Sequence, residues 1–421
     1  MTNVLISGAS VAGLSLAYWL RQHGCTPTLI ERAPRLRSGG QAIDIRGAAR
    51  AVVTEMGIMD TVRAHHTGTR GIAIVNPDGE RVAKMGGDDM GDSGGIVAEI
   101  EILRGDFVRI LHQAVGPDVE YIFDDTITGL TETAGGVTVA FAKALPRTFD
   151  LVVGADGLRS NVRSLMFGKD TEFVRDLGYY TAYFPARCDF GFDGWELMCN
   201  WPAGNGVGGR VSLLYPLGDT GEIRAMFSFA SPGLPIDRRD VEAQKRLLAK
   251  VFAGTGWLVP GLIDQMWQTE DLYFDRVGEV KVAQWSRGRV ALLGDSAFGG
   301  SLGMGTSMAI VGAYVLAGEL AAAQGEHGTA FAAYQNAMRD YVAANQKRPP
   351  GGARGFAPST RHGIRLRNLM MRMLPYLPGK AKMSGDIQQA ANSITLKQYG
   401  GGPGTTTDRL PTTMGRPPAA H

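Results

Sequence analysis

The chain has few of the features that mark secreted, membrane or nucleic-acid-binding proteins. Its 421 residues include only 3 cysteines, without CxxC spacing, which excludes a disulfide framework and indicates free thiols in a reducing compartment. Basic and acidic residues nearly balance, at 43 and 41, so charge gives no reason to expect binding to nucleic acid. No uninterrupted apolar run reaches the ~18 residues of a membrane span, and the first residues lack the regions of a signal peptide. We therefore expect a cytoplasmic protein without a membrane span or a nucleic-acid partner.

The sequence also lacks the usual arrangements for metal or nucleophilic catalysis. Its 7 histidines are scattered, and no Ser-His-Asp, Cys-His or metal-ligand spacing is evident. We accordingly expect no metal ion and assign no catalytic side chain. Glycine, in contrast, is abundant, with 58 residues, about twice its usual share of roughly 7%. This abundance indicates many tight turns and close approaches of the backbone.

Three motifs with glycine, far apart in the chain, each follow an apolar run that is typical of a buried strand. They are Gly8-Ala9-Ser10-Val11-Ala12-Gly13, Gly154-Ala155-Asp156-Gly157-Leu158-Arg159-Ser160, and Gly294-Asp295 running into Gly303-Met304-Gly305. The first and the third lead into a helical pattern. Together they predict a site for a long, bent, phosphate-bearing cofactor, which would carry the chemistry itself.

The first motif lies inside a predicted βαβ unit. The pattern indicates a strand, a helix and a second strand, at Val4 to Ser7, Leu14 to Gln22 and Thr26 to Glu31. Gly8 and Gly13 occupy the outer glycine positions of a dinucleotide fingerprint, and the small Ser10 between them still lets the backbone approach a pyrophosphate. Glu31 ends the second strand, where its carboxylate is placed to bind the hydroxyls of a ribose.

The other two motifs each place an aspartate at the end of a strand. Asp156 could accept a hydrogen bond from a cofactor hydroxyl, or it could orient its own loop. Asp295 could accept from polyol hydroxyls. The run from Gly303 to Thr306 then opens a helix whose N–H groups either face a developing negative charge or form an ordinary helix start.

The three motifs, in this order and at these positions, resemble the FAD-dependent class A aromatic hydroxylases, of which para-hydroxybenzoate hydroxylase is the type. The stretches Gly39 to Gly47 and Gly303 to Ser307 look most like the actinobacterial branch near the tetracycline-inactivating flavin monooxygenases. This resemblance covers roughly residues 1 to 350. It implies an FAD-dependent enzyme that consumes NADPH or NADH. Such an enzyme inserts one oxygen atom from O2 into an aromatic or polyketide-like small molecule, through a flavin C4a-hydroperoxide, in antibiotic biosynthesis or inactivation.

The resemblance also implies roles for individual residues. Arg104 would contact the FAD backbone, Asp295 the ribityl chain, and the run from Gly303 the pyrimidine edge of the flavin. The cofactor-binding positions implied are Gly8, Ser10, Val11, Ala12, Gly13, Glu31, Arg32, Gln41, Arg104, Asp156, Asp295, Gly303, Met304, Gly305 and Thr306. Candidates for NAD(P)H are Arg46, Arg159 and Arg163. Only one dinucleotide fingerprint occurs, so NAD(P)H would bind transiently, without a second Rossmann domain.

One loop departs from the family pattern. Family members usually follow Gly-Asp with alanine, then histidine or tyrosine, and soon a proline. Here Ser296-Ala297-Phe298-Gly299-Gly300-Ser301-Leu302 is about two residues shorter and has no proline. The loop on the active-site face of the flavin is therefore expected to differ, with consequences for flavin mobility and oxygen activation.

The predicted fold class is α/β, with a Rossmann-like FAD-binding domain, a second domain built on an antiparallel sheet, and a C-terminal helix. Expected boundaries are 1–70, 96–177 and 271–350 for the FAD-binding domain, 71–95 and 178–270 for the substrate domain, 351–400 for a C-terminal helical segment, and 401–421 for a disordered tail. Alternating apolar residues in the substrate domain suggest pocket positions at Tyr183, Trp201, Met226 and Phe227, of which about half would face a ligand. The basic helix at Arg365 to Leu374 either packs across both domains or meets a membrane surface or partner.

Two other functions remain open from the sequence. A flavoprotein of the same fold could act as a reductase or dehydrogenase without oxygen insertion. A protein that kept the fold could also bind a nucleotide without catalysis, which the altered loop at 296–302 allows. Either a monomer or a homodimer is compatible with the sequence.

Overall fold

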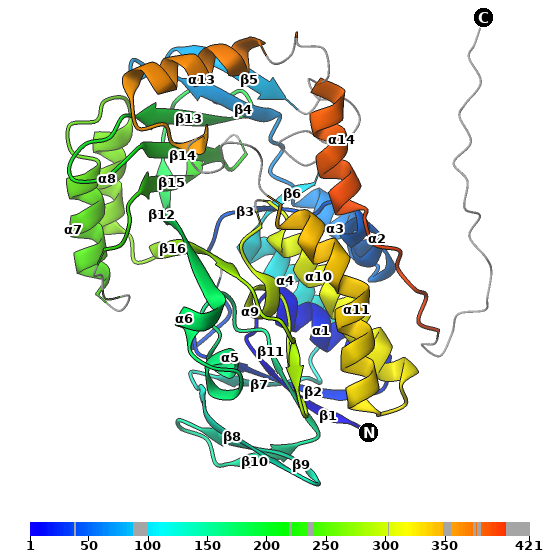
Figure 1. The fold of residues 1–421 in the computed structure, drawn as a ribbon. Coiled ribbons are helices and arrows are strands. Elements are labelled where there is room, and N and C mark those ends of the chain that lie inside the picture. The colour runs from blue at the N-terminus through cyan, green and yellow to red at the C-terminus, as the bar shows by residue number, and fades with distance from the viewer. Residues whose placement is uncertain are drawn as a thin grey trace, which may run out of the picture.

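The computed structural model describes residues 1–37, 39–86, 100–218, 221–234, 237, 240–301, 303–347, 355–373, 376 and 380–400. The expected tail at 401–421 lies outside these residues. Figure 1 shows two halves, one built on a parallel sheet near the N-terminus and the other on a larger sheet that carries β13, β14 and β15. The long strand β12 (Val174–Arg187) runs from one half into the other, and β16 (Tyr273–Val280) returns beside it.

The first half contains a six-stranded sheet in the order β17-β18-β11-β1-β2-β7, parallel except where β17 meets β18. These strands are β1 (Asn3–Ser7), β2 (Thr26–Glu31), β7 (Glu120–Phe123), β11 (Leu151–Gly154), β17 (Ser286–Arg287) and β18 (Val290–Leu292). The central strands are apolar and buried on both faces, as parallel strands covered by helices require.

Helices and small sheets complete this half. The helices are α1 (Val11–Gln22), α2 (Ala48–Glu55), α3 (Met59–Ala64), α4 (Arg104–Val115), α5 (Asn161–Met166), α6 (Asp170–Phe173), α9 (Asp295–Phe298), α10 (Gly305–Ala322) and α11 (His327–Asn345). The small sheets pair β3 (Ala42–Asp44) with β6 (Glu101–Leu103), and β8 (Ile127–Thr133) with β9 (Gly136–Phe141) and β10 (Arg147–Phe149). Helix α10 is long and apolar enough to cross a membrane, but 78% of it is buried inside the protein, as in a core helix.

The second half is a seven-stranded sheet in the order β16-β12-β15-β14-β13-β4-β5. Its other strands are β4 (Gly71–Val75), β5 (Arg81–Gly86), β13 (Trp195–Trp201), β14 (Arg210–Pro216) and β15 (Glu222–Ala230). The sheet is antiparallel as predicted, apart from the pair β13–β4, which is parallel. A hairpin turn at Asn76 to Gly79 joins β4 to β5.

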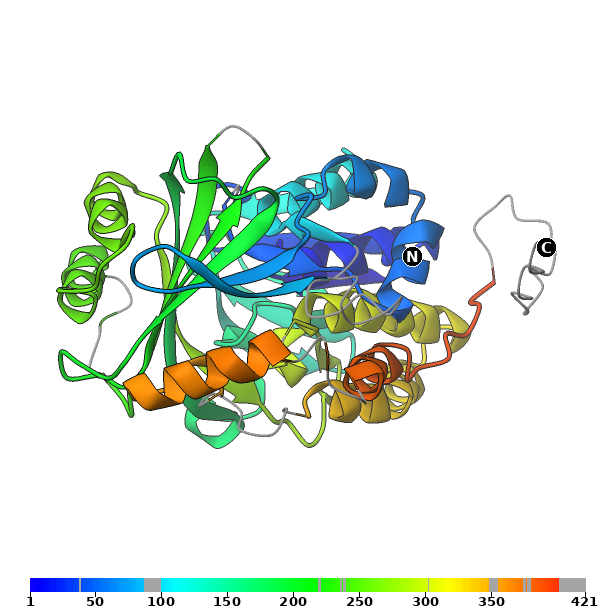
Figure 2. The same cartoon turned by 90° about the horizontal axis from the view of Figure 1, so that it is seen from above.

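Two helices, α7 (Val241–Val251) and α8 (Val259–Gln268), cover one face of this sheet, as Figure 2 shows. Helix α13 (Arg361–Met373) lies across β5 and β13 and contributes Met371 to the hydrophobic cluster of the other face. The predicted basic helix therefore packs on the sheet. Helix α14 (Lys380–Ala391) packs against α11.

The domain boundaries themselves remain a proposal. Strand β16 bears on them, because it belongs to the seven-stranded sheet although its residues fall in the range 271–350 assigned to the FAD-binding domain. Its sequence, YFDRVGEV, mixes charged and apolar residues, so no strand was predicted there.

Candidate functional site

The three glycine motifs meet at one edge of the parallel sheet. They follow β1, β11 and β18, which are neighbours in the sheet and run in the same direction, so their carboxyl ends lie side by side. Ala155 N–H donates to Ser7 O at 2.8 Å, and Leu293 N–H donates to Gly154 O at 2.9 Å. Ligands of open α/β sheets bind at such carboxyl ends. The predicted convergence of the motifs is therefore present in the fold.

Close backbone contacts explain the two outer glycines of the first motif. A Cβ added to Gly13 would lie 1.9 Å from Gly8 O, and one added to Gly8 would lie 2.5 Å from Ala155 O. Gly8 also has a φ of +107°, which side chains rarely adopt. Glycine at these positions lets α1 start directly against the strand ends. The N–H groups of the first turn of α1 then face the sheet edge, as at anion-binding helix starts.

Glu31 is held beside this turn. Its carboxylate accepts hydrogen bonds from Ala9 N–H at 3.0 Å and from Ala33 N–H at 2.9 Å. Each carboxylate oxygen has a further lone pair for another donor. Ser10 is the N-cap residue of α1, without a side-chain cap of its own. Arg32, the next predicted residue, is exposed.

Asp156 is occupied by protein donors. Its carboxylate accepts hydrogen bonds from Ser160 Oγ, from the backbone N–H groups of Asn161 and Val162, and from Ser296 Oγ at 3.1 Å. Burial raises the pKa of this carboxyl, and the hydrogen bonds act in the opposite direction. Of the two roles considered from the sequence, these contacts support the second, since Asp156 caps α5 and ties the second motif to the third.

Arg163, a predicted NAD(P)H residue, is placed where NAD(P)H cannot reach it. Its side chain is fully buried, and its guanidinium donates to Ser296 O at 2.8 Å, to Leu158 O at 2.7 Å and to Asp170 at 2.6 Å. The prediction for Arg163 is therefore wrong, because the motif uses this arginine to bind its own loops together. Arg159 is partly exposed and lies 3.9 Å from Asp170.

Asp295 lies in a recess, as its exposure and the protein that surrounds it together indicate. Its side chain is accessible to solvent, yet desolvation by the surrounding protein raises the pKa of its carboxyl, with Arg104 acting in the opposite direction. Arg104, in turn, starts α4, and its Nε has no hydrogen-bond partner among the described residues. A Cβ added to Gly40 would lie 3.0 Å from that Nε. An accessible acid and an orphaned cation in one recess are what a bound polar ligand would satisfy.

The start of α10 lies beside a salt bridge from the 41–47 segment. A Cβ added to Gly303 would lie 3.3 Å from Asp44 Oδ2, and one added to Gly305 would lie 3.6 Å from Asp295 Oδ1. Asp44 accepts two hydrogen bonds from the guanidinium of Arg46, at 3.0 and 2.9 Å. Arg46 N–H donates to Ser307 Oγ at 2.9 Å, which fixes this segment to the helix start.

The remaining predicted residues lie along the same recess. Gln41 accepts a hydrogen bond from Arg104 N–H at 3.0 Å through its backbone carbonyl. Val11 and Met304 are buried, whereas Ala12 and Thr306 are partly accessible at the starts of α1 and α10. The predicted set is thus brought together, with Arg32 and Arg159 at its periphery.

The unusual loop after Asp295 forms a compact turn. Its residues 295–298 make the single turn α9, and Val280 N–H donates to Gly299 O at 2.9 Å, which joins the loop to β16. Gly300 has a φ of +98°, and an added Cβ would lie 2.5 Å from the Cα of Glu279. The missing proline is thus replaced by a glycine turn that packs on the seven-stranded sheet. Leu302 lies outside the described residues.

The four predicted pocket residues are divided between the two faces of the seven-stranded sheet. Phe227 stacks on Phe252 with ring centroids 4.4 Å apart, and Trp201 meets the same ring edge-on. Both therefore belong to the core under α7 and α8, and their placement in a pocket is corrected, because alternation along a strand sends neighbours to opposite faces. Tyr183 and Met226, which pair directly across β12 and β15, lie on the other face.

That other face, which we call the inner face, is turned toward the first half. Arg224 on β15 forms a salt bridge of 3.0 Å with Asp271, and an added Cβ on Gly39 would lie 2.2 Å from Asp271 Oδ2. Glu196 on β13 shares a side-chain hydrogen bond with Glu101 of β6. The inner face therefore borders the segments that contain Gly39, Gly40 and Asp44.

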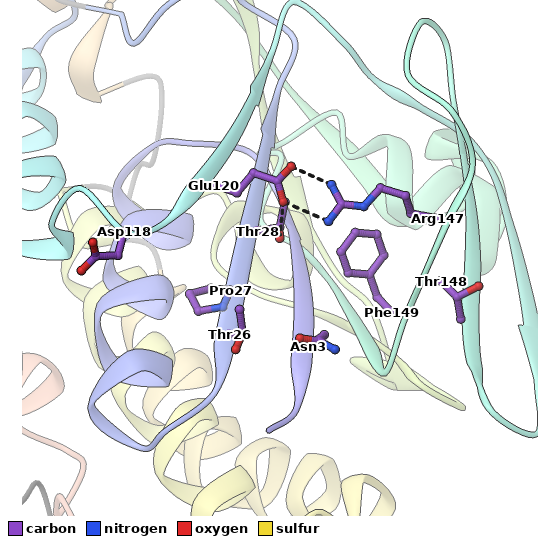
Figure 3. A pocket seen from close by; sticks show the side chains of 9 residues that line it. All are labelled: Asn3, Thr26, Pro27, Thr28, Asp118, Glu120, Arg147, Thr148 and Phe149. Atoms are coloured by element: carbon purple, nitrogen blue, oxygen red, sulfur yellow. Dashed lines mark hydrogen bonds and ion pairs between the residues drawn. The ribbon is translucent and has the colours of Figure 1, made fainter.

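A separate cleft lies at the opposite, amino-terminal end of the parallel strands (Figure 3). It measures about 220 Å³ and is lined by Asn3, Thr26, Pro27, Thr28, Asp118, Glu120, Arg147, Thr148 and Phe149. Arg147 donates to both carboxylate oxygens of Glu120, at 2.7 and 2.9 Å. The cleft shares no residue with the glycine motifs, so we assign it no part in the site.

Comparison with known proteins identifies the family. Residues 1–175 match the family described as FAD binding domain. A flavin-dependent monooxygenase from an unknown prokaryotic organism is 38% identical, in an alignment that covers 82% of this chain and 87% of that protein. This chain belongs to the FAD-dependent monooxygenases. Solved structures agree: the tetracycline destructase Tet(55) superposes with a TM-score of 0.76 at 32% identity over 95% of this chain and 99% of that one. The tetracycline destructase Tet(51) superposes with a TM-score of 0.78 at 29% identity, covering 95% and 100%.

The family assignment establishes FAD as the cofactor class and confirms the predicted fold class. Sequence reasoning nevertheless missed several residues that border the recess: Asp44, Glu101, Glu196, Tyr215 and Arg224. None belongs to a glycine motif. The signal that was present is the position of Glu196 and Arg224, which are charged residues inside otherwise apolar strands.

Proposed function

We propose that this FAD-dependent monooxygenase consumes NADPH or NADH and inserts one oxygen atom from O2 into a flat aromatic or polyketide-like molecule. The observation that carries the proposal is the recess itself. Contacts outline it: Arg104 interacts with Asp295 and with Glu31 beside the first turn of α1. Asp271, which lies against Gly39, joins this group to Arg224 of the inner face. The likeness of the whole chain to tetracycline destructases supports a polyketide substrate and a role in antibiotic inactivation. We further propose a cytoplasmic enzyme that acts as a monomer or homodimer.

The residues present fit FAD. Glycine at positions 8 and 13 lets α1 start directly against the strand ends, and Arg104 Nε is orphaned among the described residues. Bound FAD would supply hydride acceptance and oxygen activation. In our proposal, the N–H groups of α1 hold its pyrophosphate and Glu31 binds its ribose. Asp295 binds the ribityl chain, and Arg104 contacts the backbone of the cofactor.

The start of α10 would stabilise negative charge. Met304 caps this helix without a side-chain hydrogen bond, and its first turn contains no acidic residue. The free N–H groups of Gly305 and Thr306 and the positive end of the helix dipole therefore suit a flavin edge that gains negative charge on reduction. The apolar side chains of the inner face, opposite the start of α10, would keep water away from the reacting atoms.

NAD(P)H binding is assigned to fewer residues than the sequence suggested. Arg163 is withdrawn because it is fully buried and both of its terminal guanidinium nitrogens bond to its own loops. Arg46, beside Gly303, and Arg159, at the periphery, remain the candidates. Because only one dinucleotide fingerprint is present, we propose that NAD(P)H binds transiently in the same recess.

A reductase without oxygen insertion is the alternative that the experiment must separate. The glycine turn at 299–300, which replaces the proline-containing loop of the family, is the observation that keeps it open. The FAD-loaded protein should be mixed with NADPH or NADH under ¹⁸O2, with flat phenols and tetracyclines as substrates. We expect substrate-dependent NAD(P)H oxidation and one ¹⁸O atom in the product. Product without the label would identify a reductase or dehydrogenase, and a protein that takes up no FAD would contradict both functions.

A further inference from the structure

The register of the seven-stranded sheet brings three polar side chains into one row. Tyr215 of β14 pairs with Arg224 of β15. Leu197 pairs with Leu214, so the next position places Glu196 of β13 opposite Tyr215. Directly opposed residues of antiparallel strands share a face. Glu196, Tyr215 and Arg224 therefore form a continuous row across the inner face, which we call the polar row.

A second row lies two residues further along the same strands. Met198 pairs with Leu213, Leu213 with Met226, and Met226 with Tyr183. This apolar row runs parallel to the polar row. Neighbouring strands lie ~4.8 Å apart, so the Cα atoms of Glu196 and Arg224 are separated by two such steps, about 10 Å. The dimensions suit a flat molecule that lies on the apolar row with one polar edge toward the polar row.

Arg224 is a charged group with unused hydrogen-bonding capacity. Only 8% of the residue is exposed, and its Nε has no partner among the described residues. One nitrogen, Nη1, donates to Asp271, whose side chain is half exposed. A buried guanidinium with one orphaned donor and a solvated counter-ion can bind a further anion.

The other end of the row presents a neutral acid. Glu196 is 2% exposed and hydrogen-bonded to Glu101, whose Oε1 already accepts from Thr67 at 2.6 Å and from Thr69 at 2.9 Å. Burial and the neighbouring Glu101 hold the pKa of Glu196 well above its usual range. The single proton of a neutral Glu196 is taken up by the hydrogen bond to Glu101, so Glu196 offers its carbonyl oxygen as an acceptor.

The tyrosines are partly accessible members of the two rows. Tyr183 and Tyr215 keep part of their surface accessible, although desolvation by surrounding protein raises the pKa of both phenols. The only partner of the Tyr215 hydroxyl in the described structure is the sulfur of Met226, at 3.8 Å. Sulfur is a weak acceptor, so a ligand oxygen would replace it.

From this arrangement we infer that the polar row is the substrate-recognition element of the proposed monooxygenase. It takes flat molecules with an anionic oxygen at the Arg224 end and a hydrogen-bond-donating group at the Glu196 end. This inference rests on the proposed function for the location of the flavin. It adds the class of substrate and the residues that select it.

A matched pair of probes tests the Arg224 end: 3-hydroxy-2-naphthoate, an anion, and its neutral amide. Each is titrated into the FAD-loaded protein while the flavin absorbance is followed. A charge-assisted hydrogen bond contributes ~1.5–3 kcal/mol, so the wild-type protein should bind the carboxylate at least about ten-fold more tightly than the amide. Arg224→Gln should remove this preference, and Arg224→Lys should retain part of it. Arg187→Gln, in an exposed ion pair on the same sheet, is the matched control and should behave as wild type.

Asp271→Asn separates recognition from a merely structural ion pair. Removing the counter-ion should tighten binding of the carboxylate and leave the amide unchanged. A structural role would make this variant and Arg224→Gln weaken both probes alike. At the other end, Glu196→Gln, which retains the carbonyl acceptor, should keep both affinities within about two-fold, whereas Glu196→Leu should weaken both.

Three results would overturn the inference. They are a wild-type protein that binds neither probe or both equally, an unchanged preference in Arg224→Gln, and a raised KM for NADPH in Arg224→Gln with probe binding intact. The last result would assign Arg224 to the nicotinamide nucleotide. All are measured on protein that has taken up FAD and oxidises NAD(P)H, so failure of the inference is distinguishable from failure of the proposed function.

Discussion

The two halves of the molecule build their share of the site from different parts of the chain. In the first half the backbone forms the surface, and glycine is required because atoms of Gly8 and Ala155 occupy the place of a side chain. In the seven-stranded sheet the side chains form the surface, and alternate residues of the same strands serve a core or a recess. The comparison teaches that a backbone site leaves a motif in the sequence, whereas a side-chain site depends on which face of a sheet is covered.

The largest effect is expected where the backbone is closest. Gly13→Val should abolish FAD binding, and Gly13→Ala should weaken it at least about ten-fold, since the new Cβ meets Gly8 O, which cannot move without shifting β1. Equilibrium titration with FAD measures this. Gly328→Ala in α11 is the matched control, because an added Cβ there meets nothing within 4 Å and should leave FAD affinity unchanged. Equal FAD affinity in Gly13→Val and wild type would contradict the claim that the backbone of the first half forms the FAD site.

The next effect separates the two faces of the sheet. Phe227→Ala should lower the free energy of unfolding by ~3–5 kcal/mol through the cavity left between Phe184 and Phe252, with little change in probe affinity. Met226→Leu, the neighbouring residue on the inner face, conserves volume and should cost less than ~1.5 kcal/mol while changing probe affinity. Urea unfolding and probe titration measure both quantities. The opposite pattern would show that the faces have been assigned the wrong roles.

A smaller effect depends on pH. The pKa of Glu196 is raised in the folded protein, so its ionisation costs stability as pH rises above the unfolded value of ~4.3. Glu196→Gln does not titrate and should therefore raise the melting temperature relative to wild type more at pH 8 than at pH 5. Melting curves at the two pH values measure the difference. A gain that is larger at pH 5 would contradict a neutral Glu196.

The smallest effect is expected at the cleft of Figure 3, far from the recess. Hydrogen bonding to Arg147 lowers the pKa of Glu120, so the pair stabilises the protein above the unfolded pKa, and this contribution is lost as pH falls through the folded value. Both side chains are nearly half exposed, so Glu120→Gln should cost no more than ~1 kcal/mol near pH 7, and less in acid. Unchanged FAD and probe affinity in this variant would support assigning the cleft no part in the site.

The sequence predicted the first half well for a physical reason. Buried parallel strands are continuous apolar runs, and the fingerprint glycines have no substitute at contacts as short as 1.9 Å. It predicted an antiparallel sheet in the second half but neither all of its strands nor its faces. Trp201, Met226 and Phe227 are all apolar, and only α7 and α8 decide which of them is core. Arg163 was misassigned for a related reason, since an arginine in a conspicuous motif can serve the loops of its own fold.

The sequence marks Glu196 and Arg224 as charged residues in apolar strands, but it could not predict that they form a row with Tyr215. Tyr215 lies 19 residues after Glu196 in the chain, and Arg224 lies 9 residues after Tyr215. Only the register of the three strands aligns them. Likewise, burial and Glu101, which belongs to another sheet, together raise the pKa of Glu196. Such pairings are properties of the tertiary fold.

The most direct test of the whole account is the position of the flavin ring and of bound 3-hydroxy-2-naphthoate in a crystal structure of the FAD complex. We predict that the ring lies between the start of α10 and the inner face, with the carboxylate of the probe on Arg224 and its aromatic rings against Met226 and Tyr183. A flavin ring elsewhere, or a probe bound on the Trp201 and Phe227 side of the sheet, would contradict it.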